Sequence, residues 1–215
     1  MKTLLINAHP DCRGEKRYSN RMARRFAERF AEKRPQDTLE ILRLAETPAP
    51  RLTEDGLFGL WGAQAAGAPL SEEEQMTLRR HEAILEQFLG AHRIVISMPV
   101  HNFNIPSLLK DCMDNILIAR KTFRYVSGGS VGLMTDGRRA LLLQASGSVY
   151  TGGSAAAPLE FSRMYLEAMF RGIMGFESFE AVRAQGTATR AWSEERGMPG
   201  VLAEVDAAFD RLYAA

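Results

Sequence analysis

The chain has 215 residues, of which 46% are hydrophobic and 25% are charged, and its formal net charge is +1. This length predicts one domain with a sizeable core, and the balanced charge gives no reason to expect a nucleic acid or an anionic membrane surface as a partner. The apolar run near the N-terminus is too short for a signal peptide or a membrane span, so we expect a cytoplasmic protein.

The chain contains two cysteines, Cys12 and Cys112, which form neither a CxxC pair nor a Cys/His spacing typical of metal ligands. This arrangement disfavours both a disulfide framework and a structural zinc site. We therefore expect two free, reduced thiols and no metal centre.

The first 44 residues predict a strand, a helix and a second strand. Residues 4–6 form an apolar run that predicts a buried strand, and after a polar loop Ser19 is a candidate N-cap. Pro35 ends this helix, and residues 38–44 alternate as in a strand with one wetter side, which suits a sheet edge. A right-handed crossover makes the two strands parallel. One face of the helix carries apolar residues at spacings of three and four: Met22, Ala23, Phe26, Ala27 and Phe30.

Residues 45–70 interrupt this pattern with glycines and prolines, so we expect an insertion there within a single domain that spans residues 1–215. Ser71 is then a candidate N-cap, followed by glutamates in the first turn, where the helix dipole favours negative charge. This helix is expected to run to Leu89, with Gly90 at its end. His81, on the helix, is expected to be solvated or to act as a cap.

Residues 93–109 are the stretch around which the chain is expected to be organised. The apolar, β-branched residues 94–96 show no polar alternation, which is typical of a strand covered on both faces of a parallel sheet. A polar and aromatic loop follows at residues 100–104, and Pro106 starts a helix predicted over residues 107–120. In open α/β sheets ligands bind at the carboxyl ends of the strands, so this loop is a candidate site.

The rest of the chain predicts a hairpin, two strands and two helices. Turn signals at Gly128-Gly129 and Asp136-Gly137 frame a hairpin within residues 122–138. Apolar runs predict strands at residues 140–145 and 179–184. Helices are expected over residues 158–170 and 201–213. The alternation of strands and helices predicts an α/β fold with a parallel sheet.

Three loops follow predicted central strands, at residues 9–19, 100–104 and 146–153, and a parallel sheet brings them to one edge. The first loop offers Ser19, the N–H groups of a helix N-terminus, and cations at Lys16 and Arg17, a combination suited to a phosphate. It contains neither GxGxxG nor GxxxxGK[ST], which disfavours a Rossmann dinucleotide fold and a P-loop NTPase.

Structural interpretations of the same residues remain open. Ser19 can act simply as an N-cap, without a ligand, and Lys16 and Arg17 can belong to a solvated turn that binds nothing. Asn102 and Asn104 in a turn commonly satisfy their own backbone rather than a ligand.

Four motifs carry a resemblance to a known family. They are a strand that runs into His9 and then RYSN (residues 17–20), MPVHNFNIPSLLKDCMDNI (residues 98–116), TFRY (residues 122–125) and LLLQASG (residues 141–147). Together they resemble the FMN-dependent NADH azoreductases and quinone reductases, in the same order over nearly the whole chain. The resemblance implies a flavodoxin-like fold, in which a doubly wound parallel sheet of five strands in the order 2-1-3-4-5 has helices on both faces. It also implies a homodimer with sites at the subunit interface, and non-covalent FMN rather than FAD.

The resemblance also assigns site residues. The loop for the cofactor phosphate corresponds to His9, Arg17, Tyr18 and Ser19, the first flavin-ring loop to Val100, His101, Asn102 and Phe103, and the second to Ser146, Gly147 and Ser148. This chain departs from the usual family pattern at several positions. Azoreductases usually have serine and glutamine in place of Arg17 and Tyr18, tyrosine in place of His101, and S-R-G-G in the second ring loop.

Flavin chemistry explains why the sequence shows no catalytic triad. The flavin itself carries the hydride, so the protein need only bind, orient and tune it. Backbone N–H groups of Asn102 and Phe103 are expected to face flavin N5 and O4, and Gly147 is expected to permit close approach near N1 and O2. Four aromatic residues are expected to line the face on which substrates stack: Phe58, Trp61, Phe103 and Tyr125. His101 is a candidate proton donor.

The expected function is transfer of two electrons from NADH or NADPH to quinones or azo compounds by a ping-pong mechanism. A flavodoxin-type electron carrier that docks on partner enzymes is the main alternative. A flavin-free relative that binds another phosphorylated ligand is a third.

Overall fold

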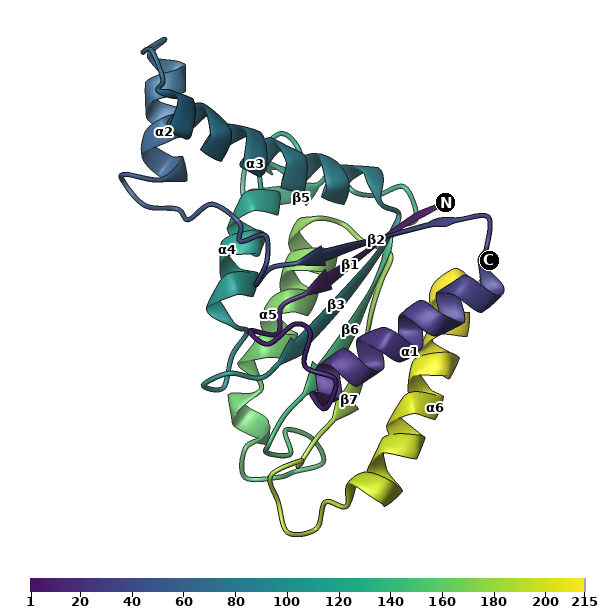
Figure 1. Ribbon diagram of the computed structural model, residues 1–215. Helices are drawn as coiled ribbons and strands as arrows, with labels where there is room; N and C mark the ends of the chain where they lie inside the picture. The colour runs from purple at the N-terminus through teal and green to yellow at the C-terminus, as the bar shows by residue number, and fades with distance from the viewer. Residues whose placement is uncertain (215) are drawn as a thin grey trace.

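The computed structural model describes residues 1–214, and its centre is a five-stranded parallel sheet. The strand order is β2-β1-β3-β6-β7, which in terms of successive sheet strands is the predicted order 2-1-3-4-5 (Figure 1). The fold class and the strand order expected from the sequence are therefore confirmed. The strands are β1 (Lys2–Asn7), β2 (Thr38–Arg43), β3 (Arg93–Pro99), β6 (Arg139–Ala145) and β7 (Ser178–Ala184).

Helices cover both faces of the sheet because its central strands carry apolar side chains on both sides. On one face Leu5, Val95 and Leu141 are neighbours in register, and they belong to the core formed with α1 and α6. On the other face the core includes Phe88 and Phe170, from segments that pack beside α4 and α5. None of the helices in residues 1–214 is both long and apolar enough to cross a membrane. The helices are α1 (Tyr18–Lys33), α2 (Leu57–Ala65), α3 (Glu72–Gly90), α4 (Ser107–Ile116), α5 (Phe161–Glu167) and α6 (Glu194–Tyr213).

Helix α1 begins earlier than predicted, so the expectation that Ser19 is its N-cap is wrong. Arg17 is the N-cap and makes no side-chain capping bond, while Ser19 is buried in the first turn. The start is fixed by packing, since the ring of Tyr18 meets Trp192 edge-on at 5.6 Å between centroids. The hydroxyl of Tyr18 also accepts a hydrogen bond from Trp192 Nε1 at 3.2 Å. This contact with the segment before α6 outweighs the capping preference of serine.

The segment predicted as an insertion contains helix α2, which the sequence reasoning missed. Its buried residues Leu57 and Leu60 pack with Leu78 of α3, and Figure 1 shows α2 beside the outer end of α3. The predicted N-cap of α3 is confirmed: Ser71 accepts a bond from Glu74 N at 3.3 Å, and Glu74 Oε2 accepts one from Ser71 N at 2.7 Å. This reciprocal pair is a capping box.

Helix α4 ends at Ile116 instead of continuing to residue 120. The hydroxyl of Thr122 donates to Ile116 O at 2.8 Å and accepts from Ile118 N at 3.1 Å, so it takes groups that a longer helix would use. The predicted hairpin follows as β4 (Phe123–Val126) and β5 (Gly129–Gly132), and it is shorter than residues 122–138.

Two predicted helix starts in the last third of the chain are wrong. The helix expected from Pro158 is a short 3-10 turn, η1 (Ala157–Leu159), followed by α5 and then by a π-helical segment, η2 (Ala168–Ile173). Helix α6 begins at Glu194 and includes Pro199, which the prediction from residue 201 had placed outside it.

Candidate functional site

The carboxyl ends of the central strands bring the three predicted loops together. Beyond the strands, Ala8 N donates to Ser97 O at 2.8 Å, Val100 N donates to Ala145 O at 2.7 Å, and Ser146 N donates to Ala184 O at 2.9 Å. Each loop is thus tied, where it leaves the sheet, to the end of the neighbouring strand. Figure 1 shows the corresponding arrowheads pointing to the same edge.

The loop after β1 is shaped by two buried asparagines that the sequence reasoning did not single out. Asn20 Nδ2 donates to Asp11 O at 2.8 Å and to Gly14 O at 3.0 Å, while Asn7 Oδ1 accepts from His9 N at 2.9 Å. The two side chains also meet, since Asn7 Nδ2 donates to Asn20 Oδ1 at 3.1 Å. Buried amides satisfied in this way hold the backbone of the loop in one shape.

The first turn of α1 provides features that fit a phosphate. The hydroxyl of Ser19 is buried and has no hydrogen-bond partner within residues 1–214. The first N–H groups of any helix lack intrahelical acceptors, and the helix dipole makes this end favourable for an anion. An orphan hydroxyl beside such N–H groups therefore suits a phosphate oxygen.

The charged residues of this loop are partly engaged with one another. Arg17 Nε lies 2.9 Å from Asp11 Oδ2, and both side chains are about half exposed. His9 Nδ1 accepts a bond from Asp11 N at 2.9 Å, which places the proton of the neutral ring on Nε2. Burial is the main cause that lowers the pKa of His9, and the positive charge of Arg17 lowers it further. The hydroxyl of Tyr18 is directed to Trp192, so its side chain helps to hold α1 rather than the loop.

The loop after β3 is a tight turn with an unusual backbone. His101 N and Asn104 O, and Asn104 N and His101 O, exchange hydrogen bonds of 2.9 and 3.0 Å. Between them Asn102 and Phe103 have φ values of 46° and 65°, which a phenylalanine adopts only at a cost of about 1–2 kcal/mol. The N–H groups of Asn102 and Phe103 have no acceptor within residues 1–214, so both can donate to a ligand. Such strain is commonly found at functional sites.

His101 and Asn104 differ in how they are engaged. Asn104 Oδ1 accepts from Ile105 N at 2.8 Å, which is the structural role that the sequence left open. The exposed side chain of His101 makes no hydrogen bond with any of residues 1–214. Its role as a proton donor stays a prediction.

The loop after β6 is fastened to a fourth loop, residues 185–189, which sequence reasoning missed. Ser146 Oγ donates to Ser148 O at 2.8 Å, and Ser146 O accepts from both Thr187 N and Thr187 Oγ1 at 3.1 Å. A Cβ atom on Gly147 would lie 3.1 Å from the Cβ of Ala188. Gly147 therefore allows the two loops to approach closely, because a side chain at this position would crowd Ala188.

Apart from Phe103, the aromatic residues expected to contact substrates do not lie beside these loops within one chain. Phe58 is 65% exposed and Trp61 packs edge-on against His81, both on the α2 arm that Figure 1 places away from the strand ends. Tyr125 is 75% exposed on the hairpin, whose Gly132 contacts Gly175, just before the amino end of β7. Helix α2, which carries Phe58 and Trp61, lies at the outer end of the long helix α3. Helix α4 runs from the loop after β3 back to the opposite end of the sheet, so the hairpin that carries Tyr125 also lies away from the three loops.

His81 itself is buried, contrary to the expectation that it is solvated or a cap. Its Nδ1 lies 3.0 Å from Asn115 Oδ1, and Asn115 Nδ2 donates to Pro50 O at 2.7 Å. The buried amide thus joins α3, α4 and the segment before α2.

Comparisons with known proteins agree with this geometry. A family model described as having a flavodoxin-like fold matches residues 1–208. FMN-dependent NADH:quinone oxidoreductase 1 from Lactiplantibacillus plantarum is 49% identical over 212 residues, covering 99% of each chain, and a Bacillus cereus protein with the same name is 46% identical over 188 residues, covering 87% of each. Among solved structures, an FMN-dependent NADH-azoreductase from Bacillus anthracis in complex with FMN superposes with a TM-score of 0.92 at 41% identity and full coverage of both chains. A second azoreductase from Bacillus anthracis gives a TM-score of 0.85 at 29% identity, covering 98% of this chain and 99% of the other.

Proposed function

Since this chain belongs to the flavodoxin-like fold family, and within it to the FMN-dependent NADH:quinone oxidoreductases and azoreductases, we propose that it transfers two electrons from NADH or NADPH to quinones or azo compounds with FMN as its cofactor. The observation that carries the proposal is the convergence of three loops. One ends in the orphan hydroxyl of Ser19, and another presents the free N–H groups of Asn102 and Phe103. The first suits a phosphate and the second suits an electron-rich ring edge.

The phosphate end of the cofactor is assigned to the first turn of α1. Ser19 Oγ and the N–H groups of this turn supply hydrogen bonds, and Arg17 supplies charge at the rim of the loop. The lowered pKa of His9 favours its neutral ring, and because Nδ1 accepts from Asp11 N, Nε2 is the nitrogen that can donate to the cofactor. These residues bind the cofactor and take no part in the redox step.

The ring end is assigned to the loops after β3 and β6. Bound FMN supplies the redox chemistry, because a flavin accepts a hydride and passes two electrons to an acceptor. The N–H groups of Asn102 and Phe103 are held by the turn from His101 to Asn104, so they stabilise negative charge without reorganising. The loop of Ser146, Gly147 and Ser148 is fixed by Thr187 and closes the other side of the site.

We infer that the enzyme is a homodimer, since aromatic and thioether side chains remain exposed on one chain. Phe58, Phe103, Tyr125, Phe161 and Met164 are between 48% and 75% exposed. A second copy would cover such a surface and bring Phe58, Trp61 or Tyr125 to the partner's loops. The helix end at residues 116–118 also motivated this expectation, but it adds little support, because Ile116 is fully buried and Leu117 and Ile118 are only partly exposed. A scattering mass equal to that of one chain, 23.9 kDa, would contradict the dimer.

A single preparation tests the proposal. The purified protein is expected to show flavin absorption, and the cofactor released on denaturation should be FMN rather than FAD. The holoenzyme should then oxidise NADH with a small quinone and no protein partner, which a docking electron carrier would not do.

The kinetic mechanism is tested with the same components. One flavin face that serves donor and acceptor in turn requires ping-pong kinetics, so double-reciprocal plots against NADH at several quinone concentrations should be parallel. Intersecting lines would contradict a shared face. The near-neutral net charge supports small-molecule partners rather than a nucleic acid.

A further inference from the structure

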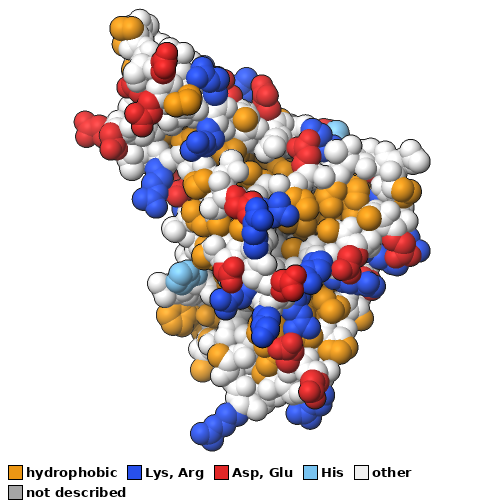
Figure 2. All heavy atoms as spheres, in the orientation of Figure 1, with side chains coloured by type: hydrophobic (Ala, Val, Ile, Leu, Met, Phe, Trp, Pro, Cys, Tyr) orange, Lys and Arg blue, Asp and Glu red, His pale blue; other side chains and the backbone are white. Residues whose placement is uncertain are grey.

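A cavity of about 320 Å³ lies between helix α1 and the edge strand β2. Its walls come from β1, the loop after it, α1 and β2, and no residue of the loops 100–104 or 146–153 lines it. It is therefore separate from the crevice formed by those two loops. Figure 2 shows this face of the molecule, with an apolar strip over β2 bordered by charged side chains. The volume is in the range of small-molecule sites.

The charge in this cavity is entirely positive. Its charged lining residues are three arginines, Arg13, Arg24 and Arg43, and no carboxylate lines it. Two of them have acidic partners at the rim, since Arg13 pairs with Glu46 and Arg24 lies 4.0 Å from Glu15. Arg43, at the end of β2, makes no direct ion pair or side-chain hydrogen bond with any of residues 1–214, and its positive charge acts on Glu46 only at longer range, where it helps to lower the pKa of that carboxyl group.

Three guanidinium groups around one hollow favour a bound anion. Arginine presents a planar set of N–H donors that matches carboxylate and phosphate oxygens, and it keeps its charge at all physiological pH values. An unpartnered guanidinium that is half-buried, as Arg43 is, loses part of its hydration and gains most from such an anion.

Part of the remaining lining is apolar. Ala23 and Ala27, one turn apart on α1, leave room that larger side chains would fill, and Leu5 forms the floor. Ile41 of β2 lines the opposite wall and is 40% exposed, a high value for a residue of the sheet. An occupant with an apolar body would cover these groups.

We propose that this cavity is a second binding site, for an organic phosphate or carboxylate that carries a small apolar body. The arginines hold the anionic group, and the wall formed by Ala27 and Ile41 takes the body. Because the cavity is built by residues other than the ring loops, its occupancy is compatible with a bound cofactor. The proposal does not depend on the redox function.

The site shares one wall with the proposed phosphate loop, and the experiment must separate the two. Asn7 and Asn20 line the cavity and also hold the loop between His9 and Gly14. The protein is therefore saturated with FMN before titration, and flavin fluorescence is followed throughout. Release of FMN in step with the probe would show competition at one site and overturn the proposal.

Calorimetric titrations with AMP, benzoate and inorganic phosphate test the ligand chemistry. We expect AMP or benzoate to bind at least tenfold more tightly than inorganic phosphate, because only the first two have a ring to cover the apolar wall. Preference for AMP identifies a nucleotide-like phosphate, and preference for benzoate an aromatic carboxylate. If neither probe binds below millimolar concentration, the proposal is wrong.

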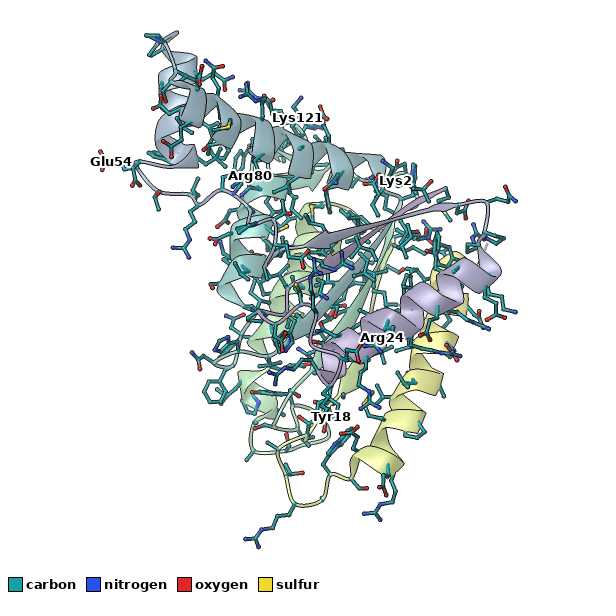
Figure 3. The ribbon with its side chains drawn as sticks, in the orientation of Figure 1. Lys2, Tyr18, Arg24, Glu54, Arg80 and Lys121 are labelled. Atoms are coloured by element: carbon teal, nitrogen blue, oxygen red, sulfur yellow. The ribbon has the colours of Figure 1, made fainter. Side chains whose placement is uncertain are left out.

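Two variants test the two halves of the cavity. Arg43→Gln removes the unpartnered charge and should weaken binding about tenfold or more, and Ala27→Phe should abolish it by filling the space. Arg80→Ala on α3 is the matched control, since this exposed arginine (Figure 3) makes no ion pair in residues 1–214 and its loss changes the net charge equally. Binding that persists in Arg43→Gln overturns the proposal even if Ala27→Phe fails to fold. If the protein retains no flavin, the proposed redox function is wrong. Binding of the probes to the wild type and to Arg43→Gln can then be compared without flavin, and this comparison still tests the proposed cavity site.

Discussion

Replacement of Arg17 by alanine probes how the proposed phosphate loop obtains its positive charge. Arg17 is the N-cap residue of α1, and its Nε lies 2.9 Å from Asp11 Oδ2 in a pair that is about half exposed. To contact a phosphate, the Arg17 guanidinium must either bind the phosphate and the Asp11 carboxylate together or give up its contact with Asp11. The affinity lost in Arg17→Ala is therefore the difference between two interactions.

The size of this difference follows from ordinary values. A hydrogen bond between charged groups contributes about 1.5–3 kcal/mol, and an exposed ion pair contributes about 0.2–1 kcal/mol. When Arg17 gives up Asp11 for the phosphate, its net contribution to FMN binding is about 1–2 kcal/mol, so Arg17→Ala should raise the FMN dissociation constant about fivefold to thirtyfold. Asp11→Asn should lower it, by at most about fivefold, since it frees Arg17 and removes a negative charge.

Titration of apo-protein with FMN, followed by flavin fluorescence, measures each constant directly. The double variant Arg17→Ala/Asp11→Asn completes the cycle, and in it the effect of Asp11→Asn should shrink because no arginine remains to be freed. Arg17→Ser, which restores the residue usual in the family, should lose less affinity than Arg17→Ala. Turnover at saturating FMN should barely change. Unchanged affinity in Arg17→Ala, with Arg80→Ala as control for net charge, would mean that Ser19 and backbone N–H groups hold the phosphate alone.

Other expectations concern stability and reactivity. Phe103→Gly removes a side chain from a position with φ of 65°, so urea unfolding should show an unchanged or slightly higher unfolding free energy. Glycine keeps the backbone N–H, so FMN should still bind, whereas quinone reduction should fall because the exposed ring expected on the substrate face is lost. Ser71→Ala should lower the unfolding free energy by about 1 kcal/mol, because the capping box of α3 is lost. The hydrogen bond from Ser71 N lowers the pKa of Glu74 in the folded protein. The ionised carboxylate therefore stabilises the fold above the ordinary pKa of 4.5, and this stabilisation is lost as the pH falls through the lower folded pKa. Wild type and Glu74→Ala should accordingly converge in acid unfolding curves. Burial raises the pKa of Cys112 to about 12, so a thiol reagent at pH 8 should label only Cys12 in the native protein and both cysteines after unfolding.

The sheet could be predicted from the sequence because each buried strand is an apolar run with clear ends. Residues 94–96 and 140–145 have no polar alternation, and this is what coverage on both faces requires. The helix ends were less predictable, since long-range contacts decide them. Trp192 fixes the start of α1, and Thr122 takes the groups that would extend α4.

The candidate site was predictable where it follows directly from strand ends. The loops near His9, His101 and Ser146 converge because parallel strands place their carboxyl ends together. The positions of Phe58 and Tyr125 were not predictable, because they depend on the direction in which α3 and α4 carry the chain. The buried position of His81 was missed for a related reason: α2, which supplies its neighbour Trp61, carries no regular apolar pattern in the sequence.

The interior position of β1, between β2 and β3, sets the order in which the protein can assemble during synthesis. β1 pairs with β2 on one side, but its other edge stays open until β3 has been made. At a synthesis rate of about 5–20 residues per second, this edge is exposed for several seconds. The apolar face of α1 remains uncovered for longer still, because its partners belong to α6, the last helix of the chain. Phe26 of α1 packs against Phe209, and Phe30 packs against Tyr213. A nascent chain that stops before α6 therefore presents an uncovered aromatic surface to chaperones and proteases, and premature termination there should yield aggregated or degraded protein rather than a shortened enzyme.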